Sequence, residues 1–401
     1  MGSDALARDR SGFARGVVYV QDRLAFARAL PNDETMSSEL DLDLHGFVRI
    51  RLVNATPRDI ATVTGQLGQI HAEKHADPDI VIEFADRLPL SSPLRYLGVN
   101  DAAYTDDAFL VLRGKHKARV RVQIPIQDIG RQCKFICERG LPAVPLLMAI
   151  VNLTALGNGA LPLHASGLVY NGSGVLVTGW AKGGKTETLL AFAANGAEYV
   201  GDEWIYLCDD GRRMYGVPEP IRVWNWHLEE LPQYRALVKR ADRARLRGLG
   251  WITGLLGLLD SGSASVALVR RINAMLRQQL YVHLRPEQLF RGACVPVATP
   301  EKIFFVASHE SPDVTVQPMV PREIAEKMVF SLQAERAEFM SYYYAFRFAF
   351  PELSNDLVER AEEIQRELLI RALESREAHA VYHPYPVSVP ALFDAMKPFF
   401  N

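Results

Sequence analysis

Residues 179–186 read Gly-Trp-Ala-Lys-Gly-Gly-Lys-Thr and complete the pattern G-x-x-x-x-G-K-[ST]. An apolar, β-branched run precedes the motif at 174–178, and a helix-forming run follows it at 187–194. In this context glycines let backbone N–H groups turn toward phosphate oxygens, while the new helix points its positive end at the same charge. The pattern therefore predicts a strand, a loop and a helix that bind the phosphates of a nucleotide.

Each polar residue of this loop has an expected part in holding ATP. We expect Lys185 to reach the β- and γ-phosphates and Thr186 to offer its hydroxyl to Mg²⁺. The other loop residues expected to lie along the phosphates are Gly179, Lys182, Gly183, Gly184 and Glu187. An acid is favoured in any first helical turn, so Glu187 carries little weight. The alternative is a glycine-rich turn with a surface lysine.

Composition sets wide limits on the class of protein. The chain has 401 residues, 48% of them apolar, and a formal net charge of −2. This length suits two or three folded units, and the near-neutral charge does not favour a nucleic-acid partner. Four cysteines without zinc-ligand spacing and an N-terminus without an apolar signal segment fit the cytoplasm. Cys133 and Cys137, four residues apart, suit one face of a helix.

The segment 248–269 is largely apolar and lies between arginine-rich stretches. Its polar centre at 260–263 divides it into two pieces, each shorter than the ~20 residues that a bilayer requires. We therefore expect no stable membrane insertion. A mobile, glycine-rich lid or an interface helix is the preferred interpretation, and contact with a membrane surface stays open.

Residues 1–135 are expected to form an N-terminal α+β domain. Thr56 and Pro57 predict the start of a helix, because threonine caps free N–H groups and proline suits the first turn. Alternating or apolar runs predict strands at 46–53, 77–84, 108–113 and 117–125. The region shows no evident catalytic cluster, so we expect it to serve as support or in substrate recognition.

Residues 141–320 are expected to form the nucleotide-binding domain, opening with a buried helix at 141–156. Asn171-Gly172 lies between apolar runs and is the strongest short signal for a hairpin, so two antiparallel strands should lead into the loop. Gly196 marks the end of the following helix. The run 198–207 is expected to form one strand with Asp202 and Glu203 in its middle.

A core strand is expected at 303–307, and residues 321–401 should form a helical region that packs on this domain. Its helices are predicted near 321–339 and 352–374, where Glu and Arg recur at i, i+4 spacing typical of solvent-facing helix surfaces.

His164, the loop at 179–187, Gly196 and the Val-Gly-Asp-Glu at 200–203 resemble the catalytic core of HPr kinase/phosphorylase. In that bacterial serine kinase, related in fold to phosphoenolpyruvate carboxykinase, a histidine opens the hairpin and an Asp-Asp pair ends the block. Here Glu203 replaces the second aspartate, and the family's C-terminal signature has no counterpart. The resemblance covers residues 164–207. It implies a P-loop kinase fold with a mixed sheet and ATP-dependent transfer to a hydroxyl, as in divergent members that modify peptides or small molecules.

Four residues beyond the loop are candidates for the chemistry. Asp202 is the candidate base for an incoming hydroxyl, with a buried acid paired to Lys185 as the alternative. Glu203 is assigned to Mg²⁺ or its waters, although on a strand it would point to the opposite face from Asp202. The resemblance implies that His164 polarises the γ-phosphate or orients the base; a satisfied core histidine is the alternative. Arg222 is a weaker candidate for clamping substrate or phosphate.

The sequence therefore predicts an ATP- and Mg²⁺-dependent kinase that phosphorylates a hydroxyl, most simply a serine in a peptide or protein. A kinase of small-molecule hydroxyls and a non-catalytic, nucleotide-binding regulatory module are the alternatives. An ATPase coupled to motion is less favoured, because no arginine finger or sensor motif is evident. The sequence leaves a homo-oligomer open.

Overall fold

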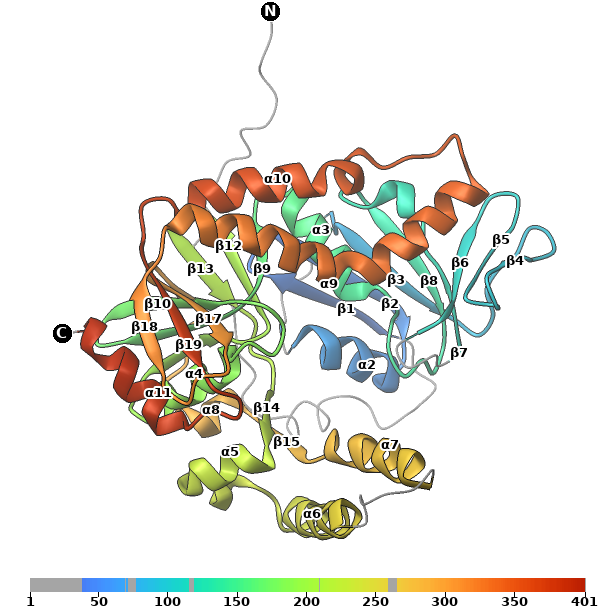
Figure 1. The fold of residues 1–401 in the computed structure, drawn as a ribbon. Coiled ribbons are helices and arrows are strands. Elements are labelled where there is room, and N and C mark those ends of the chain that lie inside the picture. Colours follow the sequence, from blue (N-terminus) through green and yellow to red (C-terminus); the bar gives the residue numbers. More distant parts are fainter. Residues whose placement is uncertain are drawn as a thin grey trace, which may run out of the picture. The chain divides into compact units, whose positions relative to one another are not determined.

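The computed structural model describes residues 38–68, 70, 77–114, 119–208, 210–258 and 265–400 (Figure 1). Contacts within the chain divide it into two units. The first contains the residues up to Pro125 together with Arg131–Pro145, and the second contains Ile126–Gly130 and everything from Leu146 onward. Both units combine helices with a mixed sheet, and the C-terminal region is mainly helical. The fold is therefore of the mixed α/β type.

The first unit is built on one eight-stranded sheet with the order β1-β2-β3-β8-β7-β6-β5-β4. Strands β2, β3 and β8 are parallel to one another, and the other neighbours are antiparallel. The elements are β1 (Ser38–Leu44), β2 (Val48–Ala55), α2 (Pro57–Leu67), β3 (Ile80–Ala85), β4 (Arg95–Leu97), β5 (Ala102–Tyr104), β6 (Phe109–Arg113), β7 (Arg119–Gln123) and β8 (Cys133–Glu138). All four strands predicted for this region are present.

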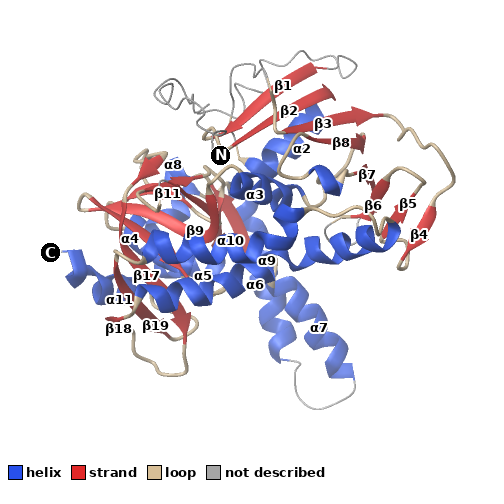
Figure 2. Cartoon of the chain, turned by 90° about the horizontal axis from the view of Figure 1, so that it is seen from above, coloured by secondary structure: helices blue, strands red, loops and turns tan. Residues whose placement is uncertain are grey.

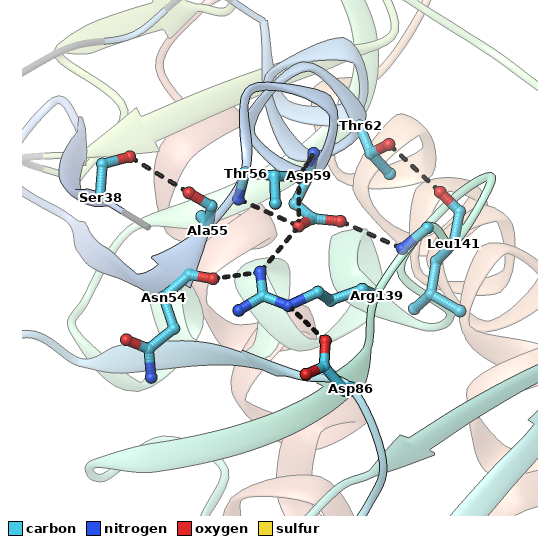
Figure 3. Close-up of polar contacts among 10 residues, drawn as sticks. Ser38, Asn54, Ala55, Thr56, Asp59, Thr62, Asp86, Arg139 and Leu141 are labelled. Carbon is cyan, nitrogen blue, oxygen red and sulfur yellow. Dashed lines mark hydrogen bonds and ion pairs between the residues drawn. The ribbon is translucent and has the colours of Figure 1, made fainter. Parts of the chain in front are cut away.

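Helix α2 begins where the sequence predicted, with Thr56 as its N-cap and Pro57 in its first turn. The Thr56 hydroxyl accepts a hydrogen bond from the backbone N–H of Asp59, and the Asp59 carboxylate accepts one from the backbone N–H of Thr56. Asp59 is 1% exposed and also accepts from the Gly140 N–H and from Arg139 (Figure 3). The capping carboxylate thus ties the helix to the chain segment that follows β8.

The helical interpretation of Cys133 and Cys137 is wrong, because both lie on strand β8 and are buried. Residues i and i+4 share one face of a strand as well as one face of a helix. The spacing therefore did not distinguish the two structures.

The second unit contains a nine-stranded sheet whose main path is β16-β13-β12-β9-β10-β17-β19-β18, with β11 paired to β9. A separate two-stranded sheet joins β14 and β15. The strands are β9 (Leu161–Tyr170), β10 (Ser173–Thr178), β11 (Glu198–Gly201), β12 (Trp204–Cys208), β13 (Arg213–Gly216), β14 (Ile221–Trp224), β15 (Tyr281–Leu284), β16 (Val297–Ala298), β17 (Pro300–Ser308), β18 (Thr315–Pro318) and β19 (Glu377–His383). The predicted hairpin is confirmed as the antiparallel pair β9 and β10.

The helices of the second unit are α3 (Leu147–Gly157), α4 (Lys185–Ala193), α5 (Asn225–Glu230), α6 (Arg240–Leu258), α7 (Ser265–Arg277), α8 (Pro286–Leu289), α9 (Pro321–Ala349), α10 (Asp356–Leu373) and α11 (Val389–Met396). The short 3₁₀ helices are Ile126–Asp128, Pro232–Leu237 and Lys397–Phe400. Long helices α9 and α10 lie side by side (Figures 1 and 2). The two predicted C-terminal helices are therefore present, and the first of them runs ten residues beyond the predicted end at 339.

The predicted strand at 198–207 is wrong in one respect, because it is broken into β11 and β12 at Asp202 and Glu203. Glu203 adopts a left-handed backbone with φ +65°, an uncommon conformation for a residue other than glycine. The break removes the alternation that would have pointed Asp202 and Glu203 to opposite faces.

The apolar segment 248–269 falls on α6 and α7, which pack against each other (Figure 2). Its polar centre at 260–263 lies outside the described part of the chain, and the lid and interface-helix interpretations of the whole segment remain predictions. No helix within the described residues combines the length and apolar character needed to cross a bilayer.

Candidate active site

The G-x-x-x-x-G-K-[ST] loop follows the C-terminal end of β10 and leads directly into α4. Strands β10, β17 and β19 run parallel, so their C-terminal ends meet at one edge of the sheet. Strand β9 is antiparallel to β10, and Thr178 is paired with Ala165. This register brings His164 and Ser166 to the same edge. Ligands of open α/β sheets bind at such edges, beyond the carboxyl ends of the strands.

Aromatic packing fixes helix α4 and hence the loop that precedes it. The ring of Phe192 on α4 lies 5.1 Å from Tyr170, 5.2 Å from Phe393 and 5.2 Å from Phe400, measured between ring centroids. All these contacts are close to edge-on, the arrangement that aromatic pairs prefer. The helix N-terminus is therefore held in place by the core.

Two glycines allow the loop to pass close to its neighbours. Gly179 has φ +151°, and a Cβ there would lie 2.3 Å from the carbonyl oxygen of Val306. Gly184 has φ +111°, and a Cβ there would lie 2.1 Å from Nε2 of His383. His383 is fully buried, and its Nε2 is 2.9 Å from the carbonyl oxygen of Gly183. A side chain at either glycine would therefore force the loop apart.

Lys185 lies inside the loop rather than on the surface, with 6% of its area exposed. Its ammonium group donates to the carbonyl oxygens of Gly179 (3.3 Å) and Trp180 (3.1 Å). Burial lowers the pKa of Lys185, while the nearby carboxylates of Asp202 and Glu203 act in the opposite direction. The interpretation of this residue as an ordinary surface lysine is wrong.

Asp202 connects the loop to strand β9. Its Oδ2 accepts a hydrogen bond from the Thr186 hydroxyl at 3.2 Å, and its Oδ1 accepts one from the Ser166 hydroxyl. The side chain is buried, with 4% of the residue exposed. Burial, followed by the negative charge of Glu203, raises the pKa of Asp202 to about 6. A carboxyl with such a pKa is ionised near neutral pH and still basic enough to accept a proton there.

His164 lies between two carboxylates. Its Nε2 is 3.3 Å from Glu203, and its Nδ1 is 2.6 Å from Glu335 on α9. Burial alone would lower the pKa of His164, but the hydrogen bonds to Glu203 and Glu335 raise it above its usual value. The hydrogen bond to His164 in turn lowers the pKa of Glu203. The arrangement favours an imidazolium ion clamped by Glu203 and Glu335.

A further carboxyl group near these acids comes from Glu219, in the turn before β14. One of its oxygens, Oε1, is buried without a hydrogen-bond partner among the described residues. Burial, with smaller contributions from Glu203 and Asp202, raises the pKa of Glu219 to about 8. The raised pKa favours the protonated form of Glu219 near neutral pH, in which the carboxyl group has a hydrogen-bond donor.

The other predicted site residues, Glu187, Arg222 and Lys182, have surroundings different from those of Lys185, Asp202 and His164. Glu187 is turned toward the buried ring of His227 on α5, with Oε1 and Nε2 3.2 Å apart. Arg222 on β14 stacks its guanidinium over the ring of Tyr281 at 4.7 Å, and its charge also favours ionised Glu203. Lys182 is exposed at the loop tip, with a left-handed φ of +63°. Glu187 thus has a hydrogen-bonding partner of its own, while Arg222 affects the acidic cluster only through its charge.

The side chains present fit a magnesium-bound triphosphate. Gly184 caps α4 without any side-chain hydrogen bond, so the first turn keeps N–H groups for an anion. Thr186 supplies a hydroxyl oxygen, and the neighbouring acidic residues, Glu203 among them, supply carboxylate oxygens of the kind that Mg²⁺ prefers. Within the described residues no three His, Cys, Asp or Glu side chains form a metal cage. Phosphate and water would therefore complete the coordination, as is usual for Mg²⁺.

Sequence patterns did not reveal Ser166, Glu219, Glu335 or His383. The sequence could have indicated Ser166, because this residue lies two positions after His164 on a predicted strand and hence on the same face. Glu219 lies in the turn 217–220 just before Arg222, but nothing local marks it as buried. Glu335 and His383 come from elements far along the chain, and only the tertiary structure brings them to the loop.

Comparison with known proteins does not assign a family to the chain. No protein-family model matches the chain, and no curated protein is significantly similar to it.

Proposed function

We propose that the chain is an ATP- and Mg²⁺-dependent kinase that transfers the γ-phosphate to a hydroxyl of a peptide or protein. The observation that carries this proposal is the hydrogen bond between Thr186 of the loop and the buried carboxylate of Asp202. A loop hydroxyl beside a carboxylate, with an ammonium group from Lys185 in the same charge cluster, is the set of groups that phosphoryl transfer requires.

Lys185 and the backbone of the loop hold the β- and γ-phosphates in this proposal. To do so, the ammonium group leaves the carbonyl oxygens of Gly179 and Trp180 for phosphate oxygens. Thr186 would hold Mg²⁺ through its hydroxyl, and Glu203 or waters would supply further ligands. The metal would neutralise negative charge as it develops on the phosphates.

Asp202 accepts the proton of the acceptor hydroxyl in the same step. The acceptor oxygen forms a bond to the γ-phosphorus, the bond from that phosphorus to the bridging oxygen breaks, and ADP leaves with the electron pair. His164 as an imidazolium supplies positive charge beside the transferred group, and Glu203 and Glu335 hold its ring in place. Arg222 is the weakest part of the assignment, because its guanidinium is committed to the ring of Tyr281.

The decisive experiment measures two quantities on the parent and on Asp202→Asn. Calorimetry gives the affinity for ATP with Mg²⁺, and labelled ATP with serine-containing acceptors gives the rate of transfer. As a base, Asp202 should be dispensable for binding but should contribute about 10²- to 10⁴-fold to transfer. Asp394→Asn, an exposed aspartate on α11, is the matched control.

The outcomes separate the competing functions. Loss of Mg²⁺-dependent ATP binding in Asp202→Asn would identify a metal ligand rather than a base. Binding of ATP by the parent without any ADP formed in the presence of acceptors would favour the regulatory module. Transfer only to small hydroxyl compounds would favour the small-molecule kinase, and absence of ATP binding by the parent would refute the proposal.

A further inference from the structure

Helices α6 and α7 of the second unit pack chiefly against each other and carry charge of mainly one sign (Figure 2). Together they contain seven arginines and one acidic residue, Asp242, in a chain whose net charge is −2. Asp242 lies 3.7 Å from Arg245, and its single charge offsets one of the seven. The two helices are therefore a local positive region of a nearly neutral protein.

The arginines of this region fall into two groups by their contacts. Arg245 is committed to the fold, because its guanidinium donates to the carbonyl oxygens of Gln279 (3.0 Å) and Tyr281 (2.7 Å). Four others are exposed and have no ion pair with any described residue: Arg240, Arg247, Arg271 and Arg277. These four guanidinium groups can therefore face an anionic partner without giving up a contact seen in the structure.

Large apolar side chains lie on the solvent-facing side of α6. Trp251 is 72% exposed and Leu255 is 44% exposed. The inward side of the helix is marked by Leu246 and Thr253, which are seven residues apart and both buried. Trp251 and Leu255 each lie two residues from Thr253, or about 200° around the helix. Both side chains therefore point away from the protein.

Arginines and apolar residues follow one another along this face. Arg240, Arg247, Trp251 and Leu255 are separated by seven, four and four residues, so they lie on one side of the helix. Guanidinium groups bind phosphate oxygens well, and indole and leucine side chains are suited to the boundary between lipid headgroups and acyl chains. The order along α6 thus matches an anionic headgroup layer followed by the acyl boundary.

The same combination recurs on α7. Ile272 and Met275 are 42% and 59% exposed, and Arg271 and Arg277 lie beside them in the sequence. Neighbouring exposed apolar side chains of this size mark a surface that contacts a protein or a membrane. The unpaired arginines beside them favour a negatively charged membrane. Since no described helix can cross a bilayer, the contact would lie at the surface.

We propose that α6 lies on the surface of a membrane that contains anionic phospholipid. Trp251 and Leu255 enter the acyl boundary, and Arg240 and Arg247 contact the lipid phosphates. This inference goes beyond the proposed kinase function, and its test requires neither ATP nor an acceptor.

The experiment sediments the full chain with vesicles of phosphatidylcholine mixed with phosphatidylglycerol, and with vesicles of phosphatidylcholine alone. The chain should bind the mixed vesicles at least about tenfold more tightly, and added salt should weaken this binding, because exposed charges are screened. Brominated acyl chains quench indoles that reach them, so they should quench the emission of the parent. Trp251→Phe keeps an apolar ring and should still bind, but most of the quenching should be lost.

Two double variants test the two parts of the face. Trp251→Ser with Leu255→Ser, and Arg240→Gln with Arg247→Gln, should each weaken binding to the mixed vesicles at least about tenfold. The matched controls replace residues of the same kinds that are exposed elsewhere and should bind like the parent: Tyr344→Ser with Phe348→Ser on α9, and Arg58→Gln with Arg87→Gln in the first unit.

Three outcomes would overturn the inference. The first is equal binding of the parent to both kinds of vesicle, or unchanged binding in both double variants. The second is loss of binding in the arginine variant alone, without quenching of Trp251, which would assign the face to a soluble acidic partner. The third is a parent that is dimeric without vesicles, becomes monomeric in the Trp251 and Leu255 variant and binds no vesicles, which would assign the face to an interface between copies of the chain.

Discussion

The loop region of the second unit and a group of four arginines in the first differ in how far their charges are exposed. Around Lys185 the groups range from buried Lys185 and Asp202 to Glu203, whose side chain is 54% exposed, and burial lowers the pKa of Lys185 and raises those of Asp202 and Glu219. Around Arg119, at the ends of strands β6, β7 and β8 of the first unit, the guanidinium groups of Arg113, Arg119, Arg121 and Arg139 are partly or fully exposed. Buried charges interact strongly, whereas solvent-facing charges are screened by water and salt. Substitutions in the two regions should therefore differ in size.

The largest effect should follow from Lys185→Ala. The ammonium group is the buried cation of the loop, and losing two charge-assisted contacts to phosphate should weaken ATP binding about 10²- to 10³-fold. Calorimetry with Mg²⁺ present measures the change, and Lys327→Ala, at an exposed lysine of α9, is the control. If Lys185→Ala weakens ATP binding no more than Lys327→Ala does, substitutions in the buried region do not have the larger effect expected of them.

The next effect concerns stability and pH, through Glu219→Gln. Burial raises the pKa of Glu219 to about 8 from an ordinary value of 4.5, so the folded state binds more protons than the unfolded state between these values. The contribution of Glu219 to the free energy of unfolding is fully present below about pH 4.5 and is lost as the pH rises through about 8. The variant cannot ionise and should be more stable than the parent at pH 9, on the order of 2–4 kcal/mol.

Urea unfolding at pH 5 and pH 9 measures this difference, with Glu310→Gln as an exposed control. If the difference in stability between the parent and Glu219→Gln is the same at pH 5 and pH 9, Glu219 is solvated. The buried region would then differ less from the exposed one than we expect.

A smaller effect is expected from Glu335→Gln, because the Glu335 side chain is 32% exposed and its interaction with His164 is partly screened. Removing this carboxylate should lower the pKa of His164, because its hydrogen bond and negative charge favour the imidazolium form. Stability from the ion pair is present below the ordinary histidine pKa and fades as pH rises through the folded value, so the variant should be destabilised more at pH 6 than at pH 9.

NMR titration of His164 measures the shift directly. Glu338→Gln, an exposed position on the same helix, is the control. An unchanged titration would mean that Glu203 alone holds the ring.

The smallest effect should come from Thr56→Ala in the first unit. Loss of the capping box should cost about 1 kcal/mol of that unit's stability and leave ATP binding unchanged. Thr64→Ala, within the same helix, removes no cap and should be neutral or slightly stabilising. Thermal unfolding followed together with ATP affinity tests both points, and a fall in ATP affinity would show that the two units are energetically coupled.

Local features of the sequence determined the elements and the loop. Asn171-Gly172, Thr56-Pro57 and the glycines of the motif act over a few residues, because turns, caps and phosphate loops depend on local backbone geometry. The placement of Lys185, Thr186 and Asp202 in one region was likewise foreseeable from a strand that follows the loop's helix. What escaped this reasoning was the break at Asp202 and Glu203.

Only the tertiary structure decided the electrostatics. Whether Asp202 and Glu219 are buried, and whether Glu335 reaches His164, depends on packing between elements up to 171 residues apart. The pairing of Arg113 with Arg119 depends in turn on the register of two strands. Burial and register are properties of the assembled core, and a pKa or a cavity follows from the distances that the core imposes rather than from the order of residues along the chain.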